Sequence, residues 1–324
     1  MKLGGPVVML GLLIVQHGFP KFLQTLVNSV ALGSLYALIA LGYTLVYGVL
    51  RFINFAHSDV FAVGAWLSFT FATAFGWVAT SSPLWGMPLV LLLVMAACAL
   101  LGVTIEILAY RPLRKAPRLN VLITAIGVSL FLQNVGQLSS VFGTQPQRMP
   151  SLIEDRSLFT IAQVHIRLVD VTVIALALAL MMALQWMVFR TRLGRAMRAV
   201  SFDEKVASLM GINVNRVVTI TFAIGSALAA AGGLLFALKY EGLKQTADAT
   251  WVLLGLKAFV AAVVGGIGNV RGAVAGALLI GVVEVFGASY LSPHMRDVYV
   301  FVILIVVLLL KPSGILGKAV REKV

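Results

Sequence analysis

The stretch "FLQTLVNSVALGSLYALIALGYTLVYGV" (residues 22–49) decides the class of fold. It contains no charged residue and exceeds the about 20 apolar residues that a helix needs to cross the hydrocarbon core of a bilayer. We therefore expect a membrane-spanning helix here. Eight further apolar segments follow, and each is a candidate span: 53–75, 86–110, 119–142, 169–189, 217–238, 251–264, 272–290 and 298–311. Two of them, 251–264 and 298–311, are short for a membrane span.

The composition of the whole chain supports a membrane protein. Of 324 residues, 60% are hydrophobic and only 11% are charged, whereas soluble domains carry about 25% charged residues. The mean hydropathy is +1.00. No segment has the ten-residue alternation of a membrane β-strand. The sequence therefore predicts an all-α, polytopic transmembrane helix bundle with about 8–10 spans and a coupling helix on the cytoplasmic side.

The net charge of +13 is explained by orientation in the membrane, because Lys and Arg are enriched in cytoplasmic loops. If 111–118 is placed inside and the spans alternate, the inside segments hold sixteen Lys and Arg and the outside segments hold six. This bias predicts a cytoplasmic C-terminus and a cytoplasmic loop at 190–216. Nucleic acid is not an expected partner.

Three regions are expected along the chain. Residues 1–21 form an N-terminal extension, either a short span or an interfacial segment, residues 22–317 form the membrane domain, and residues 318–324 form a cytoplasmic basic tail. A single cysteine excludes a disulfide within the chain, and the four histidines lack the spacing of a metal site. We expect no metal.

The loop 190–216 is a polar, basic block between two apolar segments. Ser201 and Glu204 have the spacing of a capping box, and Gly211 is a natural C-terminal stop, so a helix of about two turns is expected at 202–210. Its apolar residues share one face. So short a helix is not stable alone, and its face rests either on the membrane or on a cytoplasmic partner. The residues assigned to this coupling surface are Arg195, Ser201, Phe202, Glu204, Val206, Ala207, Leu209, Met210 and Gly211.

The same block carries a family resemblance. "ASLMGI" (207–212) keeps the alanine-x-x-x-glycine core of the loop by which ABC-importer permeases contact their ATPases. The whole "GRAMRAVSFDEKVASLMGIN" resembles the cytoplasmic loop of branched-chain amino-acid permeases of the LivH type. Three further stretches agree with that family: "LGSLYALIALGYTLVYGVLRFINFAHSD" (32–59), "KAFVAAVVGGIGNVRGAVAGALLIG" (257–281) and "KPSGILG" (311–317).

The resemblance implies a permease subunit of the bacterial inner (plasma) membrane. It would pair with a second, homologous permease subunit and two cytoplasmic ATPase subunits, which bind ATP and Mg. A periplasmic substrate-binding protein would deliver leucine, isoleucine, valine or similar substrates. Relatives that carry urea and short amides keep the substrate class open.

The chain itself lacks the sequence of a nucleotide site. A P-loop reads GxxxxGK[ST], because glycine amides and a lysine surround the phosphates. In the most similar stretch, "PSGILGKA" (312–319), Pro312 stands at the first glycine and Ala319 at the Ser/Thr position. ATP-driven transport would therefore need a separate ATPase chain, and no cofactor is expected in this one.

Glu284 is a carboxylate near the middle of the apolar segment 272–290, and such groups usually face protein or a cavity. Small residues share its stripe and permit close helix packing. Glu284 is either a structural partner of Lys257 or a group in the translocation path. The glycines assigned to helix packing are Gly268, Gly272, Gly276 and Gly281.

Two polar stretches interrupt the apolar segments, "NFAHSD" (54–59) and "GGIGNVRG" (265–272). They are either ordinary cytoplasmic turns or breaks within helices, which in transporters line a central cavity. Asn54, His57 and Asp59 are therefore candidates for the translocation path or gating, together with Lys257 and Glu284. No catalytic constellation is present, so an enzyme is not expected.

Two classes of transporter remain. An importer subunit driven by partner ATPases fits the coupling loop, and a stand-alone secondary amino-acid transporter would use carboxylates near the midplane. The capped cytoplasmic helix favours the importer.

Overall fold

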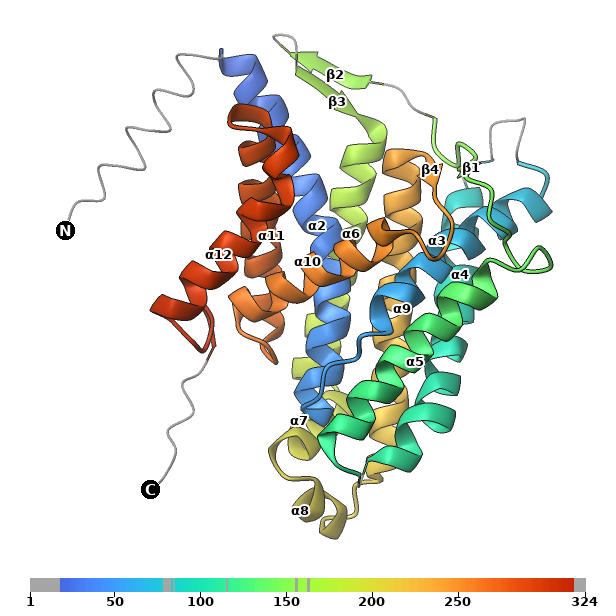
Figure 1. Ribbon diagram of the computed structural model, residues 1–324, viewed down its shortest axis with the longest axis vertical. Coiled ribbons are helices and arrows are strands. Elements are labelled where there is room, and N and C mark those ends of the chain that lie inside the picture. The colour runs from blue at the N-terminus through green and yellow to red at the C-terminus, as the bar shows by residue number, and fades with distance from the viewer. Residues whose placement is uncertain are drawn as a thin grey trace.

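The computed structural model describes residues 18–77, 83, 85–114, 116–154, 157–161 and 164–317. Residues 1–17 of the predicted N-terminal extension lie outside the described residues. The predicted basic tail, residues 318–324, lies outside them too. The described part is a helical bundle with four short strands (Figure 1).

Every predicted span is a helix. In chain order they are α2 (Phe19–Leu50), α3 (His57–Ala74), α4 (Gly86–Ile105), α5 (Arg118–Gly136), α6 (Leu168–Arg190), α9 (Val214–Tyr240), α10 (Ala249–Gly265), α11 (Val270–Tyr290) and α12 (Arg296–Leu310). A π-helical turn η1 (Glu106–Tyr110) and a 3-10 turn η2 (Arg111–Leu113) extend α4, and a 3-10 turn η3 (Pro293–Met295) precedes α12. By length and composition, seven helices among the described residues can cross a membrane; α3 is not among them and α10 is shorter.

Four short strands tie the loops at one end of the bundle. β1 (Gln147–Arg148) pairs antiparallel with β4 (Gly242–Leu243), and β2 (Ser157–Ile161) pairs antiparallel with β3 (Val164–Arg167). The described residues between α5 and α6 therefore contain three short strands. The opposite end carries α7 (Arg192–Phe202) and α8 (Glu204–Leu209) (Figure 1).

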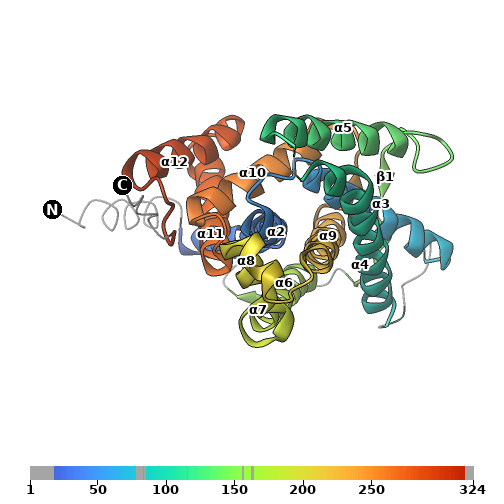
Figure 2. The same cartoon turned by 90° about the horizontal axis from the view of Figure 1, so that it is seen from below.

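Helix α2 is the centre of the bundle. Its apolar window is 94% buried, and it packs on α6, α9, α10 and α11. Seen from below, α2 and α9 lie in the middle, with α12, α10 and α5 along one side and α6, α7 and α8 along the other (Figure 2). The window of α12 is only 6% buried, so α12 presents an exposed apolar surface.

Helix α3 begins inside the bundle. The chain leaves α2 through Arg51, which has a left-handed backbone (φ 55) and donates its N–H to the Tyr47 carbonyl at 2.8 Å. It then turns back, and Asn54, His57 and Asp59 are all buried. Helix α10 likewise starts well inside the bundle, after β4 (Figure 1). The first interruption is therefore a break within the bundle, which is one of the two interpretations left open by the sequence.

The second interruption is an ordinary turn at the end of the bundle. It falls between α10 and α11, where the Ile315 N–H donates to the Val264 carbonyl at 2.8 Å and the Leu316 N–H donates to the Gly265 carbonyl at 3.0 Å. The start of α10, and not this turn, lies inside the bundle as the start of α3 does (Figure 1).

The predicted glycine stripe is partly wrong. Gly268 lies in the turn before α11 with φ +88, and no atom lies within 4 Å of the position that its Cβ would take. It therefore serves the turn and not helix packing. Gly272 and Gly276 do face α10, and a Cβ on Gly281 would lie 2.6 Å from the Gly33 Cα of α2. Close packing of α11 on both neighbours depends on these three glycines.

Candidate functional site

The end of α7 and the short helix α8 present the most exposed apolar side chains of the polar loop. The single helix expected over 202–210 is interrupted, because α7 ends at Phe202 and α8 begins at Glu204. Phe202 is 88% exposed, Leu209 is 86% exposed and Met210 is 78% exposed, and Val206 lies between them at 54%. Ala207, on the inner face, is buried. These four exposed side chains, at the spacing predicted from the sequence, are named the coupling face below. Apolar groups gathered in this way mark a contact surface.

The predicted cap of this helix was wrong. Asp203, not Ser201, is the N-cap: its side chain accepts the Lys205 N–H at 2.8 Å and the Val206 N–H at 3.0 Å. Ser201 instead lies in the last turn of α7, a helix that the loop was not expected to contain. Gly211 ends the helix with φ +81, as predicted. Arg195 is exposed on α7 and Glu204 is the first residue of α8.

The observed cap residue, Asp203, and the predicted one, Ser201, give a matched test. Asp203→Ala removes an N-cap, which costs a helix about 1 kcal/mol, whereas Ser201→Ala removes no cap. We expect the backbone amides of 204–209 to exchange with deuterium about fivefold faster in Asp203→Ala and at the original rate in Ser201→Ala. Equal exchange in the two variants would contradict the assignment of Asp203 as the cap.

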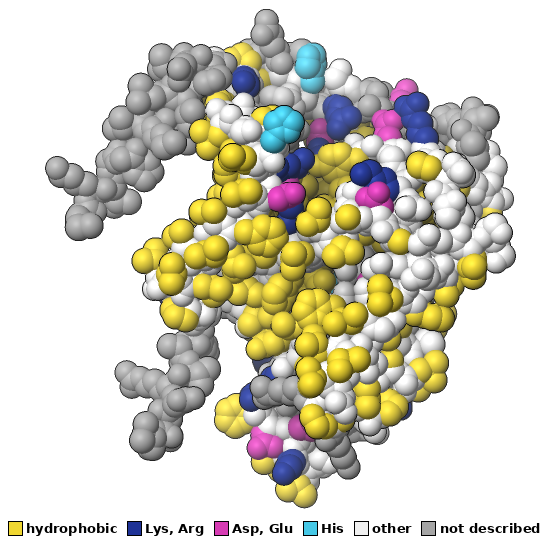
Figure 3. Space-filling view, in the orientation of Figure 1, with side chains coloured by type: hydrophobic (Ala, Val, Ile, Leu, Met, Phe, Trp, Pro, Cys, Tyr) yellow, Lys and Arg dark blue, Asp and Glu magenta, His cyan; other side chains and the backbone are white. Residues whose placement is uncertain are grey.

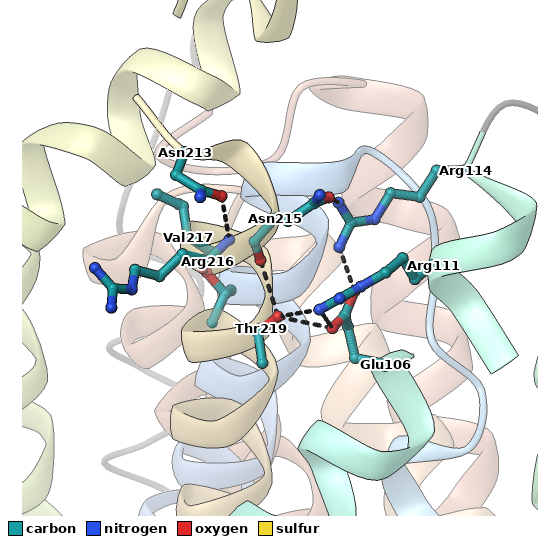
Figure 4. Close-up of polar contacts among 9 residues, drawn as sticks. Glu106, Arg111, Arg114, Asn213, Asn215, Arg216, Val217 and Thr219 are labelled. Carbon is teal, nitrogen blue, oxygen red and sulfur yellow. Dashed lines mark hydrogen bonds and ion pairs between the residues drawn. The ribbon is translucent and has the colours of Figure 1, made fainter. Parts of the chain in front are cut away.

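The loop is tied to the central helix and to α4. Arg51, at the end of α2, donates to the Ser201 carbonyl at 2.9 Å. On the other side, Asn215 and Thr219 of α9 meet a charged cluster that begins in η1 (Figure 4). The loop region is therefore connected to the bundle at two points, at the end of α2 and, through the start of α9, at the end of α4.

Glu106 is the centre of that charged cluster. It is fully buried, it forms ion pairs with Arg111 (2.8 Å) and Arg114, and it accepts the Thr219 hydroxyl at 2.8 Å. Arg114 also donates to Asn215 at 2.8 Å (Figure 4). π-helical turns such as η1 occur often at functional sites. This cluster joins the end of α4 to the start of α9.

A second charged network lies toward the opposite end of the bundle. Glu284 is 1% exposed and accepts three donors: the Tyr36 hydroxyl at 2.7 Å, Lys257 Nζ at 2.9 Å and Arg296 Nε at 2.5 Å. Lys257 also pairs with Asp297 at 2.5 Å. The predicted pair of Lys257 and Glu284 is therefore present, and it joins α10 and α11 to α2 and α12.

The predicted path residues of 54–59 form a separate buried cluster. The Tyr110 hydroxyl donates to Asn54 Oδ1 at 2.6 Å, and Gln133 Nε2 of α5 donates to Asp59 Oδ1 at 2.9 Å. The His57 ring stacks edge-on against Tyr43, with ring centroids 4.7 Å apart. The two groups of predicted path residues thus occupy different places, one at the start of α3 and one beside α10.

Several functional candidates were missed by the sequence reasoning. Glu106 lies inside a predicted span, so the rule that flagged Glu284 could have found it. Asp170 of α6, which pairs with Lys239 of α9, is likewise a carboxylate inside a predicted span. The same rule could not have found Arg296 and Asp297, because they lie just outside the predicted span 298–311.

Comparison of the sequence with known proteins identifies a family that covers most of the chain. Residues 25–308 match the family model described as "Branched-chain amino acid transport system / permease component". The chain is 41% identical over 310 residues to the high-affinity branched-chain amino acid transport system permease protein BraD of Pseudomonas aeruginosa, covering 94% of this chain and 98% of the relative. It is 40% identical to the corresponding protein LivH of Escherichia coli K12, covering 94% and 99%. A probable branched-chain amino acid permease of Methanocaldococcus jannaschii is 29% identical, covering 90% and 91%.

Proposed function

This chain belongs to the family of branched-chain amino acid transport system permease components, and we propose that it is one membrane subunit of an ATP-driven importer of branched-chain amino acids. The observation that carries the proposal is the coupling face, an exposed apolar surface formed by the end of α7 and the capped helix α8. The names of the relatives support the substrate class. As a permease component, the chain is a transport subunit and not an enzyme.

The partner at the coupling face is a cytoplasmic ATPase subunit. A short helix that lays an apolar face into a groove is a common mode of protein recognition. Phe202 and Leu209 are the expected anchors, because they are the largest and most exposed side chains of the face. Two such ATPase subunits, with their ATP and Mg, serve this chain and a second, homologous permease.

Force from the ATPases reaches the bundle through the two ties described above. A shift of α7 moves the Arg51 end of α2, and with it the turn that leads to α3. A shift of the start of α9 moves Asn215 and Thr219, and with them the Glu106 cluster. Packed helices move as rigid elements, so a small displacement of the loop becomes a tilt of the helices.

The translocation path runs along the side of the bundle formed by α5, α10 and α12, where the second permease subunit covers it (Figure 2). The start of α3 lies in that wall, with Asp59 held by Gln133 of α5. A periplasmic substrate-binding protein delivers the amino acid at the end of the bundle that carries the strands. The complex resides in the inner membrane, with the C-terminus in the cytoplasm.

The proposal is tested by co-expression with the neighbouring permease, ATPase and binding-protein genes. We expect the ATPases to co-purify with this chain, and ATP hydrolysis by the reconstituted complex to rise when binding protein and leucine are added together. Addition of urea in place of leucine is the control for the related amide permeases. Stimulation by urea but not by leucine, or failure of any ATPase to associate, would refute the proposal.

A further inference from the structure

A cavity of about 430 Å³ lies among α2, α9, α10, α11 and α12. This volume falls in the range of about 300–1,000 Å³ that small-molecule sites occupy. Charged side chains gather over it, on the upper part of the face shown in Figure 3, near the start of α12. The same face carries the side of the bundle at which the translocation path is proposed.

One part of the cavity wall is charged. Lys244, Lys257, Glu284, Arg296 and Asp297 all line it, three positive and two negative. Glu284 accepts three donors, so it holds Lys257 and Arg296 in place and has little capacity left for a ligand. The four charges around Glu284 balance one another, and Lys244, which contacts Asp248 and Thr250, gives the wall one excess positive charge.

The side chains of Arg296 and Asp297 are fixed by ion pairs and are still accessible to a ligand. The Arg296 side chain is 42% exposed and contacts Glu284 through Nε and the Tyr240 hydroxyl, and its remaining guanidinium N–H groups can donate to another acceptor. The Asp297 side chain is 50% exposed and contacts Lys257 through Oδ1, which leaves Oδ2 for another donor. A positive donor and a negative acceptor on adjacent residues suit a ligand that carries both charges.

The rest of the wall is largely apolar. It is formed by side chains that offer hydrocarbon or ring surface to a ligand, namely Leu32, Phe236, Trp251, Leu253 and Leu254. Such a surface suits an aliphatic side chain, whose transfer out of water it favours.

We propose that this cavity is a binding site of the permease itself for a zwitterionic aliphatic amino acid. Arg296 binds the α-carboxylate, Asp297 binds the α-ammonium group, and the apolar wall receives the side chain. Glu284 and Lys257 are positioning residues that act through these two. This inference rests on the proposed function and assigns its substrate to named residues.

The test measures binding of radiolabelled leucine to the assembled complex in lipid nanodiscs, with no binding protein present. We expect saturable binding in which leucinamide, which lacks the carboxylate, and N-acetylleucine, which lacks the ammonium group, compete at least about tenfold more weakly than isoleucine. Competition by either analogue as strong as that by isoleucine would overturn the zwitterion assignment.

Variants locate the site. Arg296→Gln and Asp297→Asn should each weaken leucine binding about tenfold. Leu253→Trp fills the cavity and should weaken leucine binding more than alanine binding. Arg148→Gln is the matched control, because Arg148 is an exposed arginine whose side chain pairs with Glu241 outside the cavity. Co-purification of the ATPases verifies that each variant is assembled.

The outcomes separate the two proposals. Leucine binding that is absent, or that the cavity variants leave unchanged, overturns this inference if ATP-driven uptake with the binding protein is intact, and the proposed function then stands. Loss of uptake under every condition in the unmodified complex overturns the proposed function and this inference with it.

Discussion

The double variant Phe202→Asp, Leu209→Asp releases the ATPase subunits from the complex and reduces ATP-driven leucine uptake to background. Both side chains are more than 80% exposed in this chain, and the proposal buries both in a groove of the ATPase. Truncated anchor residues cost about 2 kcal/mol or more each, and a buried carboxylate adds a desolvation cost. The two changes together correspond to a loss of about 1,000-fold in affinity.

The control for this variant is Ser208→Asp, which places one aspartate on α8 away from the coupling face. It should leave ATPase association within about twofold of the original. The measurement is co-purification of the ATPases with the membrane-inserted chain, followed by titration of the binding affinity. A double variant that retains its ATPases would show that the coupling face rests on the membrane instead.

Glu284→Ala is expected to give the largest loss of stability of any single substitution in the ion network. The carboxylate is buried and balances Lys257 and Arg296, so its removal leaves Arg296 without its carboxylate partner and the buried Lys257 with Asp297 alone. Removal of one partner from a buried pair costs about 3–5 kcal/mol. The expected result is a large fall in the thermal unfolding temperature of the purified complex.

Glu241→Ala is the matched control for the loss of a carboxylate. Its ion pair with Arg148 has side chains that are 40% and 83% exposed, and exposed pairs contribute about 0–1 kcal/mol. The unfolding temperature of this variant should stay close to the original. If the two variants unfold alike, Glu284 does not organise the junction of α2, α10, α11 and α12.

The sequence predicted the helices well because lipid imposes a simple rule. A chain cannot leave backbone N–H and C=O groups unpaired in hydrocarbon, so each long apolar segment must be a helix. The same rule cannot place a helix start at a given depth. That α3 begins inside the bundle follows from tertiary contacts, such as Gln133 on Asp59, that connect distant parts of the chain.

The candidate site could be predicted only where it depends on local sequence. The exposed apolar side chains of the coupling face are present, but the single helix expected over 202–210 is divided at Asp203, and the cap assigned to Ser201 is Asp203. Both residue types cap helices well, and the unexpected helix α7 decided between them by taking Ser201 into its last turn. Tyr36 lies 248 residues from Glu284 in the sequence, so spacing carried no sign of it, and Arg296 was missed because it lies just outside its predicted span.

The most direct test of the account is uptake of leucine by proteoliposomes that contain the complete complex, with the binding protein outside and ATP inside. The account predicts accumulation of leucine that requires both ATP and the binding protein and that persists when the proton and sodium gradients are collapsed. Accumulation by this chain alone, driven by an ion gradient without ATP, would contradict it and would make the chain a secondary transporter.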